Sequence, residues 1–339
     1  MSDAEVHECD VVVVGAGLSG LTAARDLQEA GRRVVVVDKG RSVGGRLATR
    51  RMGTARLDHG AQFFTQRGPE LRALIDELTA TGLVREWCRG FGGGDHHPRY
   101  QVVGGMNALA KHLAADLDDV RTGVQVTAVR RTDRGWSVLG DGVDLRAPAV
   151  LLTSPVPQTL ALLAAGEVEL DAGIGPALAR IDYDPAFALM LLLDGPGAVP
   201  EPGAVQFDAT HPDPARGPFS FVADNASKGL ADPSALTLHA SPRWSRSHWD
   251  RPDDEVLGAL VDAASAWTGG AGIVEAQLKR WLYAAPRTTW PERSCVAVDG
   301  PEPLVLAGDA FDGPRGEGAY VSGRSGATAV LRARTVDGT

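Results

Sequence analysis

The chain has 339 residues, 44% of them hydrophobic and 23% charged, and a formal net charge of −9. This length allows a large buried core and favours two domains over one. The negative charge argues against nucleic acid or an anionic membrane as the main partner. A local positive site for a small anionic ligand is still compatible with it.

Cysteine usage and the N-terminus indicate where the protein works. Cys9, Cys88 and Cys295 are isolated and match no metal-binding spacing, and their odd number suits a reducing compartment. We therefore expect no metal site. The first residues, MSDAEVHE, lack the features of a signal peptide, and no apolar run approaches the roughly 18 residues of a membrane span. A soluble, cytoplasmic protein is expected, without a signal for its oligomeric state.

Residues 10–38 predict a dinucleotide-binding unit. A buried-type strand at 11–14 precedes Gly15, Gly17 and Gly20, which form G-x-G-x-x-G, and a helix at 21–30 leads to a second strand ending at Asp38. Gly15 allows the tight turn, Gly17 allows a pyrophosphate to approach the backbone, and Gly20 allows the helix to pack against the strand. The helix N-terminus favours phosphates, and Asp38 can accept hydrogen bonds from a ribose.

The remaining chain predicts a second glycine turn, a sheet region and a return to the first pattern. Gly44 and Gly45 precede Arg46, which would lie near a diphosphate, although this segment taken alone is better explained as a basic surface loop. A helix is expected over 69–83, antiparallel strands over 125–145 and a buried strand over 149–152. Strand-like runs alternate with Pro- and Gly-rich loops over 176–293, around one helix near 253–267. A strand at 304–306, then Asp309, then a small-residue helix from 316 complete the chain.

These elements predict an α/β protein in which a Rossmann-type domain for a dinucleotide such as FAD is combined with a second, mixed β-sheet substrate domain. Both domains are expected to be discontinuous in sequence. The expected FAD-binding domain comprises residues 1–66, 104–155 and 295–339. The expected substrate domain comprises residues 67–103 and 156–294.

Separated motifs resemble the two-domain FAD oxidoreductases of the amine-oxidase and glutathione-reductase type, and most closely the bacterial renalases. The matching stretches are GAGLSG (15–20), VGGRLATRR (43–51), DHGAQFFT (58–65), RYQVVGGMNALA (99–110), ADNASK (223–228), LHASPRWS (238–245), KRWLYAAP (279–286) and AGDAFDGPRGEGAYVSG (307–323). They cover nearly the whole chain in the right order. Two departures, at Ala310-Phe311 and Val103-Gly104, bear on substrate identity more than on FAD binding.

The resemblance implies a non-covalently bound FAD and a defined reaction. Renalases oxidise isomers of NAD(P)H that carry hydride at ring position 2 or 6. The hydride passes to flavin N(5), and dioxygen reoxidises the flavin to give hydrogen peroxide. The implied partners are therefore a dihydronicotinamide nucleotide and dioxygen.

The resemblance also implies residue roles. Asn225, His239 and Trp281 match family positions that orient the substrate, and Tyr100 and Gln62 are further substrate-binding candidates. The first three have a plain structural alternative, because Asn225 suits an Asx turn, His239 a sheet position and Trp281 a core position. The implied cofactor-binding residues are Gly15, Gly17, Leu18, Ser19, Gly20, Asp38, Lys39, Gly45, Arg46, His59, Gly60, Ala61, Gln62, Val126, Gly308, Asp309, Glu317, Gly318 and Ala319.

Other functions of the same fold stay open. A flavin amine oxidase or desaturase would act on a small amine or secondary metabolite. A flavin monooxygenase would need NAD(P)H to reduce its flavin, and a non-catalytic flavin sensor would instead change its partner binding with redox state. Because function lies in the site rather than in the fold, the fold alone does not separate them.

Overall fold

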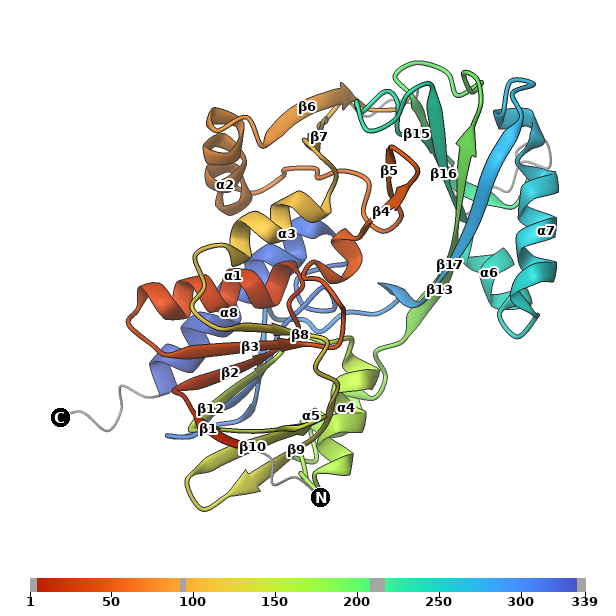
Figure 1. Cartoon of the computed structure of the whole chain (residues 1–339). Coiled ribbons are helices and arrows are strands. Elements are labelled where there is room, and N and C mark those ends of the chain that lie inside the picture. The colour runs from red at the N-terminus through yellow and green to blue at the C-terminus, as the bar shows by residue number, and fades with distance from the viewer. Residues whose placement is uncertain (1–4, 92–95, 208–216, 334–339) are drawn as a thin grey trace. The chain divides into compact units, whose positions relative to one another are not determined.

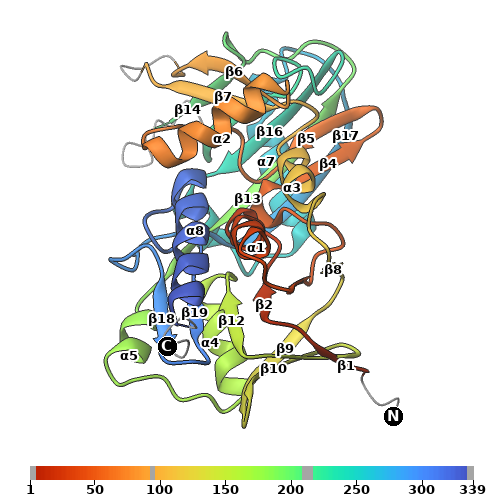
Figure 2. The ribbon, with the colours of Figure 1, turned by 90° about the vertical axis from the view of Figure 1, so that its left-hand side faces the viewer.

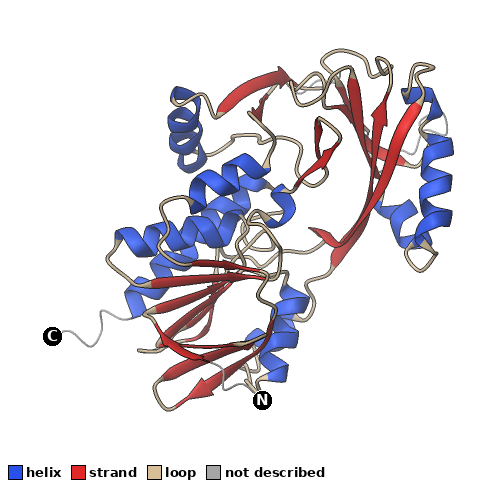
Figure 3. Cartoon of the chain, in the orientation of Figure 1, coloured by secondary structure: helices blue, strands red, loops and turns tan. Residues whose placement is uncertain are grey.

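The structure is a computed structural model, which describes residues 5–91, 96–207 and 217–333. The chain divides into two compact units, which we treat separately. Unit 1 comprises Met1–Gly45, Ala110–Asp182 and Pro286–Thr339, and unit 2 comprises Arg46–Leu109 and Tyr183–Ala285. The expected combination of a Rossmann-type domain with a mixed-sheet domain is confirmed in their architecture (Figures 1 and 3).

Unit 1 contains a six-stranded sheet whose central strands are parallel. Its order is β18 (Cys295–Val298), β19 (Leu304–Leu306), β12 (Ala149–Leu152), β2 (Val11–Val14), β3 (Val34–Asp38) and β8 (Val120–Thr122). β2 and β12 are buried at every residue, as β-branched and apolar runs in a central parallel strand should be. Helices α1 (Leu18–Glu29) and α8 (Gly316–Ala333) lie side by side over one face of this sheet (Figures 1 and 2).

The opposite side of this sheet carries a four-stranded sheet (Figure 1). Its order is β1 (Glu5–Glu8), β11 (Val143–Ala147), β10 (Gly135–Gly140) and β9 (Val126–Thr132). Helix α4 (Val156–Ala165) packs against β9, and α5 (Ile174–Leu178) follows it. Helix α3 (Asn107–Ala114) and the 3-10 turn η1 (Gly45–Leu47) each cross a boundary between the units along the chain.

Unit 2 is built on a five-stranded sheet. Its order is β14 (Ala204–Gln206), β15 (Phe219–Asp224), β16 (Ser234–Ala240), β13 (Tyr183–Leu193) and β17 (Ile273–Pro286). Hairpins β4 (Thr49–Met52)–β5 (Ala55–Asp58) and β6 (Val84–Arg89)–β7 (Pro98–Val102), with α2 (Pro69–Ala80), complete one side. Helices α6 (Pro242–His248) and α7 (Asp253–Ala263), followed by the 3-10 turn η3 (Ser265–Trp267), lie along the other side of the sheet (Figure 1).

The period of two along β13 and β16 separates a core face from a site face. Leu189 and Leu191 of β13 and Leu238 of β16 pack with α7. The alternate positions face the other way, where Met190 and Ala235 pack against the β4–β5 hairpin. His239 lies next to Leu238 in β16, so its side chain is also on the site face.

The unit boundaries differ from the expected domain boundaries in four places, two of them short: residues 104–109 fall in unit 2 and residues 286–294 fall in unit 1. Residues 46–66 belong to unit 2, because Met52 and Leu57 of the β4–β5 hairpin pack against Met190. Residues 156–182 belong to unit 1, because α4 packs on β9. The assignment of cofactor and substrate roles to the units stays a prediction. Of the helices that the structure describes, none is both long and apolar enough for a bilayer span.

Candidate functional site

The glycine turn between β2 and α1 in unit 1 has the tight geometry that its sequence predicts. Gly15 has φ +111°, in the region that favours glycine. A Cβ on Gly20 would lie 1.9 Å from the Gly15 carbonyl oxygen, so only glycine fits there. A Cβ on Gly17 would instead meet nothing within 4 Å. The space beside Gly17 is therefore open on the side from which a ligand could approach the backbone.

The N-terminus of α1 has features that suit a phosphate group. Gly17 occupies the N-cap position, and no side chain caps the first turn. The Ser19 hydroxyl in that turn is buried, and it has no hydrogen-bond partner among the described residues. Free amides, the helix dipole and an unpaired hydroxyl fit the diphosphate of FAD. Leu18, the remaining predicted residue here, is buried beside them.

Asp38, at the end of β3, fixes the backbone of the glycine turn through its carboxylate. Its carboxylate accepts hydrogen bonds from the Ala16 amide (2.7 Å) and the Gly40 amide (2.6 Å). Each carboxylate oxygen has a second lone pair, so a ribose hydroxyl can still be accepted. The backbone of 123–124 bonds to that of Asp38 and Gly40, which brings the start of β9 at Val126 into the same region. Lys39 is exposed.

The other predicted cofactor residues of unit 1 lie in glycine-rich connections. The Gly44 amide donates to the Ala16 carbonyl at 2.7 Å, so the second glycine turn, with Gly45, packs on the first. Gly308 has φ +139°, and its amide donates to Ser322 in α8 at 2.8 Å. The first two turns of α8 carry the remaining predicted residues, and Asp309 precedes them. These residues of α8 are Glu317, Gly318 and Ala319.

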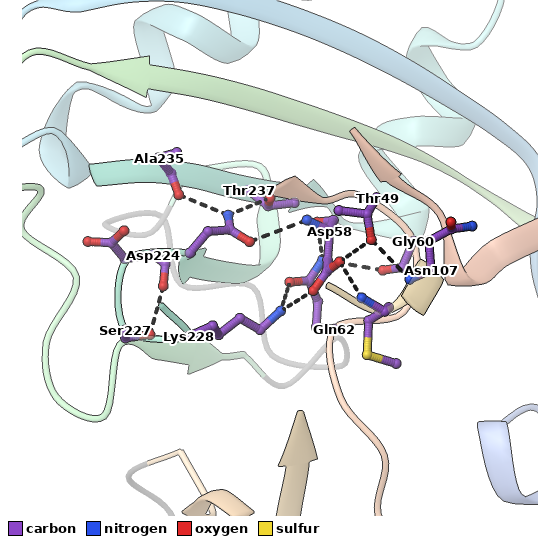
Figure 4. A network of polar contacts seen from close by, with 12 residues as sticks. Thr49, Asp58, Gly60, Gln62, Asn107, Asp224, Ser227, Lys228, Ala235 and Thr237 are labelled. Atoms are coloured by element: carbon purple, nitrogen blue, oxygen red, sulfur yellow. Dashed lines mark hydrogen bonds and ion pairs between the residues drawn. The ribbon is translucent and has the colours of Figure 1, made fainter. Parts of the chain in front are cut away.

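Unit 2 contains a buried polar network centred on Asp58, at the end of β5 (Figure 4). One carboxylate oxygen accepts from Thr49 Oγ1 (2.6 Å) and from the Met106 amide (2.8 Å). The other accepts from Lys228 Nζ at 2.8 Å. The two charged side chains are 1% and 0% exposed, so the ion pair is shielded from solvent and salt.

Gln62 and Asn225 complete this network. Lys228 Nζ also donates to Gln62 Oε1 at 3.2 Å, and the Gln62 amide donates to the Asp58 carbonyl. Asn225 is fully buried, and its oxygen accepts from the Asp58 amide at 3.3 Å. Its nitrogen donates to the Ala235 carbonyl and to Thr237. Asn225 thus holds segment 58–62 to the sheet, and Gln62 links the segment to Lys228 and to its own first residue. The predicted substrate contacts of both residues stay predictions.

His59, Trp281 and His239 are brought together beside this network. The His59 and Trp281 rings stack with centroids 5.4 Å apart, and the indole N–H donates to the His59 carbonyl at 2.8 Å. The Lys279 ammonium lies 5.0 Å from the Trp281 ring centroid. His59 Nδ1 and His239 Nε2 are buried, and neither has a hydrogen-bond partner in the part of the chain that the structure describes.

Burial keeps both imidazoles uncharged. Desolvation, together with the positive charges of Arg50 and Lys279, lowers the pKa of His59 to about 4. Desolvation, together with the positive charge of Lys228, lowers the pKa of His239 to about 4. At neutral pH these rings can donate or accept hydrogen bonds without carrying charge.

The remaining predicted residues of unit 2 are fixed by backbone contacts. The Ala61 amide donates to the Arg46 carbonyl at 2.8 Å, and a Cβ on Gly60 would lie 2.0 Å from that oxygen. The Arg46 guanidinium donates to the Tyr283 carbonyl at 3.1 Å. Tyr100 pairs through its backbone with Phe64. The predicted set therefore lies along the segment 46–64 and the strands that contact it.

Sequence reasoning missed Lys228 and Thr49 as members of the site. The signal for Lys228 was available, because the stretch ADNASK was singled out for its resemblance. From sequence alone, a lysine is expected at the surface, since lysines are almost never fully buried unless paired. No group of three or more His, Cys, Asp or Glu side chains that could hold a metal ion occurs within the described residues.

Comparison with known proteins shows the family. Residues 13–78 match the model of the NAD(P)-binding Rossmann-like domain, and residues 82–331 match that of the flavin containing amine oxidoreductases. The second match covers most of the chain, so the protein belongs to the flavin containing amine oxidoreductase family. It is an FAD-dependent oxidoreductase.

Among solved structures, the fold is similar to those of putrescine oxidase, a putative protoporphyrinogen oxidase and cyclohexylamine oxidase. A structure of putrescine oxidase has a TM-score of 0.72 and 16% identity over 97% of this chain and 100% of that one. Cyclohexylamine oxidase from Brevibacterium oxydans has a TM-score of 0.68 and 13% identity over 96% of this chain and 99% of that one. These identities show the shared fold alone.

Curated relatives match over shorter stretches. Putrescine oxidase from Kocuria rosea is 49% identical over 71 residues, which are 21% of this chain and 15% of that protein. Protein FixC from Escherichia coli O157:H7 is 28% identical over 164 residues, 45% of this chain and 38% of that protein. The chain therefore spans well under two thirds of these relatives.

Proposed function

We propose that this protein is an oxidase that removes hydride from a carbon bonded to an uncharged nitrogen. The observation that carries this proposal is the pair of buried, neutral imidazoles, His59 and His239, among the cations Arg50, Lys279 and Lys228. Asp58 is the acidic group that acts on His59, and Lys228 already neutralises it. Such surroundings disfavour a cationic ammonium and favour a neutral substrate nitrogen.

A non-covalently held FAD supplies the redox chemistry, as an acceptor of hydride at N(5) that dioxygen can reoxidise with release of hydrogen peroxide. In this proposal, Gly15, Gly17 and Ser19 hold its diphosphate, and Asp38 holds its ribose. His59, His239 and Trp281 orient the substrate. A nitrogen lone pair assists loss of hydride from the adjacent carbon, so no strong general base is required.

Two substrate classes fit this chemistry. The family comparison and the names of the relatives favour a small amine, which would react in its deprotonated form. The cations around the imidazoles favour a dihydropyridine isomer of NAD(P)H, because its ring nitrogen is uncharged and its phosphates are anionic. In the 2- and 6-isomers the hydride also leaves a carbon bonded to nitrogen, so the two classes share one reaction type.

Anaerobic mixing experiments separate the two classes. Borohydride-treated NAD, which contains the isomers, should bleach the bound flavin within seconds and at a rate that varies little between pH 6 and 9. If the substrate is an amine, cyclohexylamine or putrescine should bleach it instead, and the rate should rise with pH as the amine loses its proton. Ordinary NADH is the control. Fast bleaching by NADH alone would indicate a reductase, and no bleaching by any of them would refute the proposal.

A further inference from the structure

Lys228 lies in a turn that is itself firmly held. The turn links β15 to β16, and its Leu230 carbonyl accepts from the Arg56 amide of β5 at 2.8 Å. The Lys228 carbonyl accepts from the Arg85 guanidinium at 3.1 Å, and the ammonium lies 5.2 Å from the Trp87 ring centroid. The lysine therefore extends from a fixed base into the protein interior.

The ammonium of Lys228 joins the two ends of one short segment. Asp58 begins this segment and Gln62 ends it, and Lys228 Nζ donates to both, at 2.8 Å and 3.2 Å (Figure 4). Between them lies His59, whose ring stacks on Trp281 and whose carbonyl accepts a hydrogen bond from the Trp281 indole. Neither of these contacts involves Lys228 directly, and its hydrogen bonds reach this region through the two ends of the segment.

We propose that Lys228 is a positioning residue, which clamps segment 58–62 and so fixes His59 against Trp281. Burying a lysine is costly unless it is paired and fully hydrogen-bonded. Here the hydrogen bonds of the buried ammonium restrain a segment that lacks regular secondary structure between Asp58 and Gln62. Loss of the clamp should let the segment move toward solvent and misplace both rings.

The test uses the full-length protein with Lys228→Met and follows the ¹³C-labelled histidine side chains by NMR. The His59 resonance is assigned from its loss in His59→Gln. In the wild type His59 should not titrate between pH 5.5 and 8, because burial holds its pKa near 4. In Lys228→Met we expect its midpoint to rise by at least about one pH unit, toward 6.5, as the segment becomes hydrated.

The charges around His59 allow a shift of its titration midpoint to be attributed to movement of segment 58–62. The charged or titrating groups with the largest effects on its pKa are Arg50, Lys279, His239 and Asp58, and Lys228 is not one of these. His239 is different, since Lys228 lowers its pKa directly, so a rise at His239 alone does not support the clamp. If the His59 midpoint stays below pH 5 in the variant, the proposal is wrong.

A second variant covers the risk that an unpaired Asp58 prevents folding. Asp58→Asn combined with Lys228→Met removes both buried charges. Because the charge of Asp58 raises the pKa of His59, its removal alone would lower that pKa further. A higher midpoint in the double variant would therefore also report opening of the segment, and an unchanged or lower midpoint would refute the clamp.

A kinetic experiment, which rests on the proposed function, distinguishes an effect of Lys228 on the position of the rings from an effect on the stability of the fold. Lys228→Met should retain FAD and lower the rate constant of anaerobic flavin reduction at least about tenfold, because small misplacements are costly. Leu260→Ala, in the fully buried α7 core, should lower the melting temperature without changing that rate constant. Lys111→Met, at an exposed site, should change neither. If no substrate reduces the flavin, the proposed function fails, while the histidine titration still decides the clamp.

Discussion

The glycine turn of unit 1 and the Asp58–Lys228 network of unit 2 fix their local geometry in opposite ways. The turn achieves its shape through missing side chains, with Gly20 packed on a carbonyl and Gly17 open to one side. The network relies on side chains that are buried and charged, and its members come from β4, β5, the 225–230 turn and the start of α3. At Gly20 the local backbone motif has no room for an added atom, whereas the long-range network has no place for an unpaired charge. Substitutions can test each half of this contrast.

The largest effect is expected at the glycine turn. Gly20→Ala places a Cβ against a backbone oxygen that has little room to move, so the unfolding free energy should fall by more than about 3 kcal/mol. Denaturant unfolding of the FAD-free protein measures this loss.

Gly17→Ala is the matched control at the same turn. Its Cβ meets no atom within 4 Å, so stability should change by less than about 1 kcal/mol. If the open space is the approach to the FAD diphosphate, FAD affinity should nevertheless fall at least about tenfold in a fluorescence titration. Unchanged affinity would mean that the cofactor does not use this side of the turn.

The next largest effect concerns the dependence of stability on pH. The pKa of His59 is about 4 in the folded protein and about 6.5 when unfolded, so the unfolded chain takes up the proton first as pH falls. Stability should therefore decrease between pH 6.5 and 4, with about 3 kcal/mol lost through His59. His239 contributes in the same direction.

Chemical denaturation at a series of pH values measures this slope. In His59→Gln the slope between pH 6.5 and 4 should be shallower than in the wild type, because one titrating group has been removed. The part that remains reports His239. Equal slopes in the two proteins would show that His59 is not buried in the uncharged form.

The contrast also explains what the sequence could predict. Residues 10–38 specify the turn locally, so the strands, α1, the tight turn at Gly15 and the close packing at Gly20 could be derived from spacing alone. The Asp58–Lys228 pair spans 170 residues, and no local pattern marks which lysine enters the interior. Likewise, the sequence placed residues 46–66 with the first domain, because the partners of Met52 and Leu57 lie on β13, far along the chain.

Resemblance to a family identified some of the residues in unit 2 that no local pattern marks. It selected His59, Gln62, Asn225, His239 and Trp281, which the structure places on or beside segment 58–62. It did not distinguish residues that hold the segment from residues that could face a substrate. Asn225 and Gln62 use their amide groups inside the protein, whereas His59 Nδ1 and His239 Nε2 have no hydrogen-bond partner among the described residues.

The smallest effect on stability is expected at Trp281, where it should be accompanied by an effect on the reaction. Trp281→Phe keeps an aromatic ring beside His59 and removes the indole donor to the His59 carbonyl, which should cost about 1 kcal/mol of unfolding free energy. If Trp281 orients the substrate, the rate constant of anaerobic flavin reduction should also fall several-fold. Trp136→Phe is the matched control, because the fully buried Trp136 also donates its indole N–H to a carbonyl, that of Glu302 in unit 1. Trp136→Phe should destabilise the protein at least as much and leave the rate constant unchanged. Equal rate constants in both variants would assign Trp281 to packing alone, and His59 and His239 would then remain as the groups proposed to meet the substrate.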